Sequence, residues 1–209
     1  KSVNAVRRIN AGLGVPDSDR CRRLFSKVTV RIDHSAFDGN GANPEFFVNS
    51  RLYLRQANAR LQPFSDTPQK AQEAADILAQ SDYDPDMQST NASVTTFSFY
   101  VPENMQGTLL PGNTDSREKT RERLLAENMS AVVPYLTYVE FAGRLNPAAG
   151  GYGGDVTYRF YVGRDNCSNF DLERGREYNI SLTFRVSSIF DPDWKVGIDN
   201  WSDERLFRL

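Results

Sequence analysis

A period-two alternation of apolar and polar residues dominates this sequence. In "LFSKVTVRID" (24–33), apolar residues from Val28 to Ile32 alternate with charged and hydroxyl side chains. The same alternation runs through "DVTYRFYVG" (155–163) and "YNISLTFRVSSI" (178–189). Because successive side chains of a strand point to opposite faces, the pattern predicts strands with one buried face.

Three further segments also predict strands. "EFFVNSRLYLRQANARL" (45–61) alternates along Val48, Leu52 and Leu54, while "SVTTFSFYVP" (93–102) and "AVVPYLTYVEFAGRL" (131–145) are rich in β-branched and aromatic residues. Six or more strands, most with one apolar face, predict antiparallel sheets packed face to face. The predicted fold class is therefore mostly β, an antiparallel β-sandwich with one or two short helical insertions.

The alternation also predicts a central part of the core. Five apolar side chains of two predicted strands should lie on the inner faces of neighbouring strands. They are Tyr158, Phe160, Ile180, Leu182 and Phe184.

Two stretches interrupt the strand pattern. "SDTPQKAQEAADILAQSD" (65–82) has a helix-cap residue at Asp66 or Thr67, then Pro68 and strong helix formers. "TDSREKTRERLLAEN" (114–128) has Asp and Glu at capping-box spacing. Both predict short helices inserted in loops.

The glycine-rich "NPAAGGYGGDV" (146–156) lies between two predicted strands. It lacks the Gly-Lys-Ser/Thr sequence and the following helix that a phosphate-binding loop requires. We interpret it as the tip of a hairpin.

The polar stretch "RDNCSNFDLERGRE" (164–177) raises the question of an active site. Its flanking strands define it as a connection between two antiparallel strands, and Asp and Asn are turn formers there. A nucleophilic Cys167 would need a histidine partner, and the sole histidine, His34, follows a distant strand. The stretch is predicted to be a turn that leads into a strand.

Other catalytic and metal-binding patterns are weak. Asp84-Pro-Asp86 and Asp191-Pro-Asp193 could contribute oxygens to a calcium ion, but neither belongs to a calcium loop and Asp-Pro typically forms turns. Two cysteines and one histidine cannot form a usual structural zinc site. No G-x-S-x-G, H-E-x-x-H or Walker sequence occurs. We therefore predict no enzymatic activity, no catalytic, cofactor-binding or metal-binding residue, and no cofactor.

Composition narrows the class of protein. Of 209 residues, 39% are hydrophobic and 25% charged, which is typical of a globular domain. The net charge of −2 includes no basic excess for a nucleic-acid backbone, so no nucleic-acid partner is expected. No apolar run approaches the length of a membrane helix, and no signal peptide is visible. The missing initiator Met suggests a processed or truncated chain.

The predicted organisation has three parts. Residues 1–21 form an N-terminal arm or the remnant of a preceding domain, 22–200 the sandwich, and 201–209 a C-terminal tail. Cys21 and Cys167 either pair in an oxidising compartment or are two unrelated thiols.

A series of segments resembles a known family. "FYVPENMQG" (99–107), "LTYVEFAGRL" (136–145), "VTYRFYVGRDNCSNFDLERGREYNISLTFRVSSI" (156–189) and "DPDWKV" (191–196) occur in the order seen in the fimbrillin-like surface proteins of Bacteroidales. The resemblance covers roughly residues 22–196. Gly175 stands where the family often has Asn, a change that leaves a connecting turn intact.

The resemblance implies a transthyretin- or Ig-like sandwich, export to the cell surface as an outer-membrane lipoprotein, and assembly of pili by strand donation. Partners would be other pilus or surface-protein subunits, with a host protein or glycan as a further class. Membrane contact would come only through a lipid anchor outside this chain. "AVRRIN" (5–10) could be an arginine-specific processing site, although a charged linker is the better interpretation.

Other interpretations remain open. A hydrolase is one of them, motivated only by the surplus of carboxylates among 27 acidic residues. The chain could be a glycan-binding module of a surface lipoprotein, with aromatic residues stacking on sugar rings. Those residues are Tyr135, Tyr138, Tyr152, Trp194 and Trp201. The tail could donate a strand through Phe207 and Leu209, or it could lead into a further domain.

If residues 1–21 form an arm, limited proteolysis should cleave there first, because chain ends without packed side chains open readily. Trypsin should cut at Arg7 and Arg8 before it reaches the predicted strands, as followed by mass spectrometry. Protection of both arginines would contradict the arm.

Overall fold

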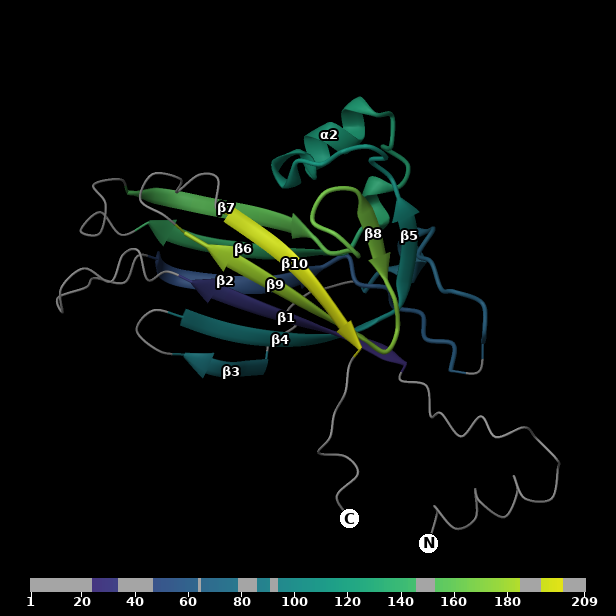
Figure 1. Cartoon of the computed structure of the whole chain (residues 1–209), viewed down its shortest axis with the longest axis horizontal. Helices are drawn as coiled ribbons and strands as arrows, with labels where there is room; N and C mark the ends of the chain where they lie inside the picture. Colours follow the sequence, from purple (N-terminus) through teal and green to yellow (C-terminus); the bar gives the residue numbers. More distant parts are fainter. Residues whose placement is uncertain are drawn as a thin grey trace, which may run out of the picture.

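The computed structural model describes residues 24–33, 47–63, 65–78, 86–90, 94–145, 153–184 and 193–200. Within them the chain forms two main sheets and a small two-stranded ribbon (Figure 1). Sheet A has the order β10-β9-β1-β4-β3. Its strands are β1 (Phe25–Asp33), β3 (Asp86–Thr90), β4 (Val94–Pro102), β9 (Arg176–Thr183) and β10 (Asp193–Asn200).

Sheet B has the order β2-β6-β7, and the ribbon pairs β5 with β8. These strands are β2 (Phe47–Arg55), β5 (Asn104–Thr108), β6 (Tyr138–Leu145), β7 (Gly154–Tyr161) and β8 (Asn169–Leu172). Leu145 pairs with Gly154, so residues 146–153 connect two adjacent antiparallel strands, as predicted. The mostly β sandwich with short helical pieces is confirmed.

One strand pair departs from the predicted antiparallel arrangement. β1 lies between β4 and β9, and it runs antiparallel to β4 but parallel to β9. Hairpins can form only antiparallel pairs, whereas β1 and β9 are far apart in the chain and can meet in either direction.

The inner faces of the two sheets form the main hydrophobic core. The alternating apolar residues Val28, Val30, Leu52 and Leu54 of β1 and β2 point inward as predicted, since each is at most 5% exposed. These side chains belong to one cluster with three residues of β4 and β6, namely Phe99, Val139 and Phe141.

The predicted core residues of β7 and β9 are also buried. Tyr158, Phe160, Ile180, Leu182 and Phe184 are all at most 8% exposed. The prediction that their strands are neighbours is wrong, because β7 belongs to sheet B and β9 to sheet A. The two strands face each other across the core, where the Tyr158 and Phe184 rings lie edge to face with centroids 5.3 Å apart.

The helix predicted for residues 65–82 is largely absent. Within 65–78 there is one 3₁₀ turn, Ala74–Asp76, and residues 79–82 lie outside the described residues. Two backbone N–H groups, of Gln69 and Ala71, donate instead to the side chains of Glu103 and Asn104. Tertiary hydrogen bonds therefore outweigh the local helix propensity of this segment.

The second insertion is helical in short pieces. Its elements are the 3₁₀ turns η3 (Ser116–Glu118) and η4 (Val133–Tyr135) and the helix α2 (Arg121–Ala126). Asp115 caps η3, whereas Thr120 caps α2. The strand predicted from Ala131 begins only at Tyr138, because η4 occupies the segment before it.

This insertion covers part of the outer face of sheet B. A second apolar cluster joins Leu124 of α2 and Leu136 to Tyr161 of β7 and Phe170 of β8. Tyr161 is therefore buried, although the alternation placed it on a solvent-facing side. Among the described helices, none has the length and apolar content to cross a membrane.

Replacing Phe184 by Ala should lower the free energy of unfolding by about 3–5 kcal/mol, because it removes a fully buried ring and leaves a cavity. Ser181→Ala, on the outward-facing side of β9, which Phe184 directly follows, should change it by less than about 1 kcal/mol. Chemical denaturation of both variants tests this. Equal stability of Phe184→Ala and the unchanged protein would contradict the burial.

Candidate functional site

The polar stretch 164–177 carries the chain from one sheet to the other. It leaves β7 of sheet B, forms β8 beside β5, and enters β9 of sheet A (Figure 1). The sequence prediction, which treats the whole stretch as a turn, misses strand β8. The signal of this strand is short, since only Phe170 and Leu172 alternate with polar residues.

The stretch begins with a turn around the carboxylate of Asp165. Its Oδ1 atom accepts hydrogen bonds from the backbone N–H groups of Cys167, Ser168 and Asn169, at 2.8, 2.5 and 3.0 Å. Oδ2 accepts the Ser168 hydroxyl at 2.8 Å. Burial alone would raise the pKa of Asp165, but these donors stabilise its charged form and lower the pKa below 3.8.

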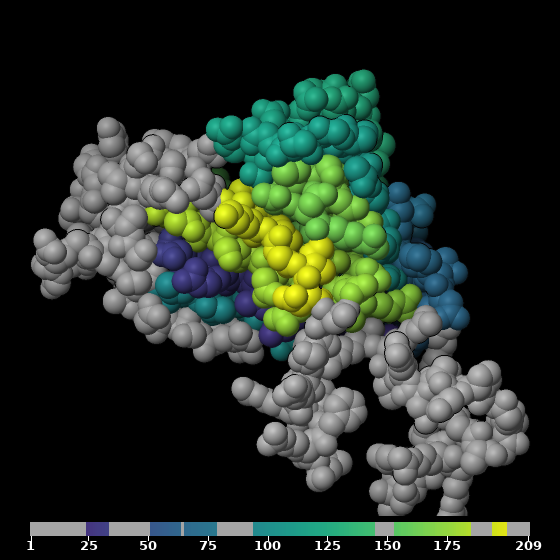
Figure 2. All heavy atoms as spheres, viewed as in Figure 1, coloured from purple at the N-terminus to yellow at the C-terminus, as the bar shows by residue number. Residues whose placement is uncertain are grey.

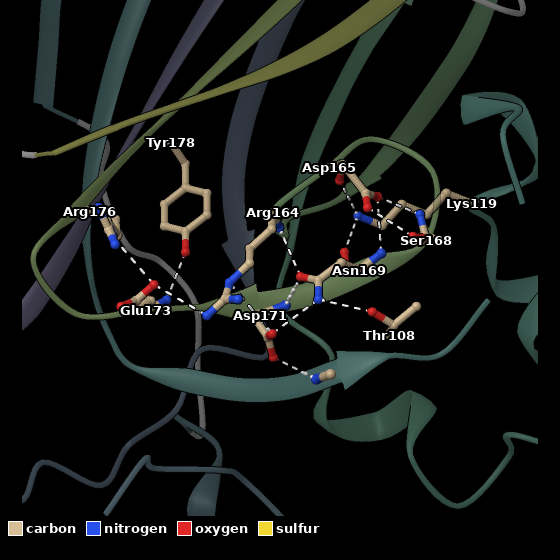
Figure 3. A network of polar contacts seen from close by, with 11 residues as sticks. Thr108, Lys119, Arg164, Asp165, Ser168, Asn169, Asp171, Glu173, Arg176 and Tyr178 are labelled. Carbon is tan, nitrogen blue, oxygen red and sulfur yellow. Dashed lines mark hydrogen bonds and ion pairs between the residues drawn. The ribbon is translucent and has the colours of Figure 1, made fainter. Parts of the chain in front are cut away.

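Lys119, from the insertion, forms hydrogen bonds with the backbone of this turn (Figure 3). Its Nζ donates to the backbone carbonyls of Asp165 at 2.7 Å and Asn169 at 2.6 Å. It also lies 4.6 Å from the centre of the Phe170 ring. Lys119 is only 2% exposed, and desolvation lowers its pKa from 10.5 to about 7.

Asn169 and Asp171 join β8 to its surroundings. Asn169 Oδ1 accepts the backbone N–H groups of Arg164 at 3.0 Å and Asp171 at 2.8 Å, and its Nδ2 donates to Asp171 Oδ2 at 3.0 Å. Asp171 Oδ1 accepts the backbone N–H of Gly107 in β5 at 2.6 Å. Gly107 has φ +83° where the β5–β8 register shifts, a conformation that favours glycine.

The end of the stretch is tied to sheet A. The backbone N–H of Glu173 donates to the Tyr178 hydroxyl at 2.7 Å, and the Glu173 carbonyl accepts the Ser26 hydroxyl of β1 at 2.7 Å. The Glu173 carboxylate is held by Arg164 and Arg176, each at 3.3 Å. The connection therefore contacts β9 and β1, which are neighbouring strands of sheet A.

Two glycines make this path possible. A Cβ atom on Gly163 would lie 1.8 Å from the Asn169 carbonyl oxygen, so any other residue would displace the turn. Gly175 has φ +76° and open space around it. Asn tolerates this left-handed conformation better than most residues, so the Asn of the fimbrillin-like pattern would also fit here.

A second polar network lies next to the first. Asn104 Nδ2 donates to the Tyr135 carbonyl at 2.9 Å, and Gln106 Nε2 donates to the Ala71 carbonyl at 2.8 Å. Nearby, an ion pair of 3.0 Å joins Arg174 to Glu103. These bonds join the extended segment 65–78 and the insertion to β5.

The arrangement indicates that these polar residues hold the backbone of the connection in place. The carboxylates of Asp165 and Asp171 are occupied by donors that hold the backbone in place. Burial raises the pKa of the Cys167 thiol above 9.0, which disfavours the thiolate. Within the described residues, no three or more metal-ligating side chains gather in one group.

Several residues considered in the sequence lie outside the described part of the chain. They are Cys21, His34, Asp84 and Asp191. The pairing of Cys21 with Cys167 and the two Asp-Pro-Asp motifs therefore stay untested.

Of the aromatic residues considered for sugar stacking, the structure describes Trp194, Tyr138 and Tyr135, and none of the three is exposed. Trp194 is 7% exposed and packs against Phe160, with ring centroids 5.5 Å apart. Tyr138 is half-buried and lies edge to face with Tyr161 at 5.4 Å. Half-buried Tyr135 lies in the turn η4, while Tyr152 and Trp201 lie outside the described residues.

Fold and site together define a β-sandwich protein whose main polar cluster joins its sheets. Residues 99–182 match the model of a domain of unknown function, DUF4906. The match covers less than half of the chain, and it includes β5, the insertion, β6, β7, β8 and most of β9. A comparison of the sequence with curated proteins finds no match.

The chain also matches several solved structures at low sequence identity. The tip fimbrial protein Mfa3 from Porphyromonas gingivalis has 14% identity and a TM-score of 0.46, over 86% of this chain and 52% of that one. A Bacteroides uniformis protein assigned to cell adhesion has 9% identity and a TM-score of 0.38, over 87% and 52%. A Bacteroides ovatus protein with the same assignment has 16% identity and a TM-score of 0.38, over 87% and 46%. The chain spans about half the length of each.

The buried Lys119 should make stability depend on pH. Between about pH 7 and 10.5 the unfolded chain binds a proton that the folded chain does not, so raising the pH through this range increases the free energy of unfolding. The slope should reach about 1.4 kcal/mol per pH unit at most. Denaturation between pH 7 and 9 measures it, below the range of Tyr161 and Tyr178, whose pKa burial raises to about 12.

Lys119→Met should remove this slope, whereas Lys70→Met, at an exposed lysine, should retain it. A slope that persists in Lys119→Met would show that another group causes it.

Proposed function

We propose that this chain is a non-enzymatic cell-surface protein, a fimbrial (pilus) subunit or adhesin-like component that assembles by strand exchange. The ordered series of fimbrillin-like segments supports the family, and the structural role of the polar cluster supports a non-enzymatic protein. The names of the solved neighbours describe a similar role, but the proposal depends on the sequence series and on the edge of sheet A.

The edge strand β10 carries the proposal. Among the described strands, sheet A ends at β10, which pairs with β9 on one side. Val196 and Ile198 are only half-buried and pack against the main core, while Lys195, Gly197 and Asp199 between them are exposed. In Figure 2, β10 (yellow) lies on the visible surface of the molecule.

A strand added along this edge would have two favourable effects. It would pair with backbone groups of an edge strand, and its side chains could extend the apolar layer over Val196 and Ile198. Five or six residues are enough for such a strand. The C-terminal tail, with Phe207 and Leu209, is one donor that the sequence offers, and it lies outside the described residues.

The rest of the proposal concerns location. A subunit of this kind would be exported and held at the outer membrane through a lipid anchor outside this chain. The arm at 1–21, the sandwich at 22–200 and the tail at 201–209 remain the proposed organisation.

A lysine at the inner face of the edge should block assembly, because an inward charge opposes the docking of an apolar strand. We expect Ile198→Lys to abolish concentration-dependent association in sedimentation velocity, and Gly197→Lys, on the opposite face of β10, to retain it. Gly197 has room for a side chain, since the nearest atom to an added Cβ is 3.9 Å away.

Thermal melting must show that both variants are folded. Two proteins must be compared, the full chain and the chain that lacks residues 203–209. If both stay monomeric at high concentration, assembly through β10 and the tail is contradicted.

A further inference from the structure

The neighbours of β10 in sheet A determine where the backbone groups of this strand point. The backbone N–H of Phe184, directly after β9, donates to the Asp33 carbonyl of β1 at 3.0 Å. The N–H and C=O groups of one strand residue point to the same side, and the side alternates from residue to residue. Since the β1–β9 and β9–β10 registers have no shift, even-numbered residues of β9 face β1 and odd-numbered residues face β10.

The same alternation identifies the backbone groups at the open edge of β10. Odd-numbered residues of β10 pair with odd-numbered residues of β9, as Lys195 does with Ser181, so their backbone groups are used within sheet A. The even-numbered residues point to the other side, where none of the described strands pairs with β10. These edge residues are Trp194, Val196 and Ile198.

The connection between β7 and β8 closes the first of these edge positions. Asn166 Nδ2 donates to the Trp194 carbonyl at 3.3 Å. Cys167 Sγ donates to Asn166 Oδ1 at 3.4 Å, which orients the amide with its Nδ2 towards Trp194. Asn166 therefore stands where a residue of an added strand would have to lie beside Trp194.

The turn around Asn166 is held on both sides. The Asp165 carboxylate accepts the backbone N–H of Cys167 at 2.8 Å, and the Asp165 carbonyl accepts Lys119 Nζ at 2.7 Å. The backbone that carries Asn166 is thus fixed by the insertion and by its own turn. An added strand could displace the Asn166 amide only by breaking its hydrogen bonds.

We propose that Asn166 sets the end and the direction of the strand that pairs with β10, an inference that rests on the assembly proposed above. The added strand comes from a second copy of this chain. It runs antiparallel to β10, pairs with Val196 and Ile198, and ends before Trp194. Asn166 acts as a positioning residue for this strand.

The direction follows from the hydrogen-bond patterns of the two kinds of ladder. In an antiparallel ladder, one residue of the added strand exchanges both hydrogen bonds with Val196, and another does so with Ile198. Neither residue needs the Trp194 carbonyl.

A parallel ladder conflicts with Asn166. The residue that accepts the Val196 N–H in such a ladder directs its own N–H at the Trp194 carbonyl, which already accepts Asn166 Nδ2. A parallel strand would therefore leave a backbone N–H without a partner or displace the asparagine, and each destabilises the pairing.

Hydrogen exchange of single backbone amides, measured by NMR on the full chain, tests the proposal. Exchange is compared below and above the concentration at which sedimentation velocity shows association. We expect association to slow exchange at the Val196 and Ile198 amides about tenfold or more, because each gains a strand partner. The Trp194 amide should change by less than about twofold.

Asn166→Ala should open the edge at Trp194. Association of this variant should then slow exchange at the Trp194 amide as well, by about tenfold or more. Asn166→Asp removes the donor but keeps the size of the side chain, so it should show the same gain and gives a second test if Asn166→Ala unfolds.

Asn179→Ala is the matched control. Its side-chain amide donates to Asp199 at 3.2 Å on the outer face of sheet A, away from the open edge. This variant should keep the exchange pattern of the unchanged protein.

Three results would overturn the inference while assembly at β10 stands. They are slower exchange at Trp194 in the associated unchanged protein, slower exchange at Ile198 without Val196, which indicates a parallel ladder, and an unaltered pattern in Asn166→Ala. A chain that does not associate, or that associates without slower exchange at any of the three amides, contradicts the proposed assembly at β10 and the inference with it.

Discussion

The position of β1 between β4 and β9 is the constraint on which the rest of the structure depends. Without β1, the described strands of sheet A would form two separate pairs, β3–β4 and β9–β10. β1 joins them through an antiparallel and a parallel ladder, and its Val28 and Val30 are fully buried. Because Val28 pairs with Tyr178, far away in the chain, this contact carries a large loop-closure cost and needs strong support from the core.

The polar connection between β7 and β9 supplies part of that support. Asp165, Lys119 and Asn169 hold the turn, and Glu173 reaches β1 through Ser26. A buried polar group without a hydrogen-bond partner destabilises the fold, whereas a paired group favours the arrangement that pairs it. The cluster therefore favours one path of the chain between the sheets. Figure 3 shows Asp165, Lys119, Asn169 and Glu173 with their polar atoms directed at neighbouring side chains and at backbone groups of the connection.

The edge of sheet A and the outer face of sheet B differ in how they are covered. Along β10, Val196 and Ile198 are half-buried and pack against the main core, while the residues between them are exposed. On sheet B, the insertion covers Tyr161 and leaves Arg159 of the same strand exposed.

The sequence by itself determined the strands with clear alternation and which of their faces is buried, as Val30, Leu54, Tyr158 and Phe184 show. This succeeds because burial of one face imposes a period of two. Only the tertiary structure decided which sheet each strand joins and that β1 pairs in parallel with β9. It also decided that strand β8 forms and that most of residues 65–78 are not helical. Each depends on partners distant in the chain, such as Glu103 and Asn104 for Gln69 and Ala71, and local propensity contains no information about such partners.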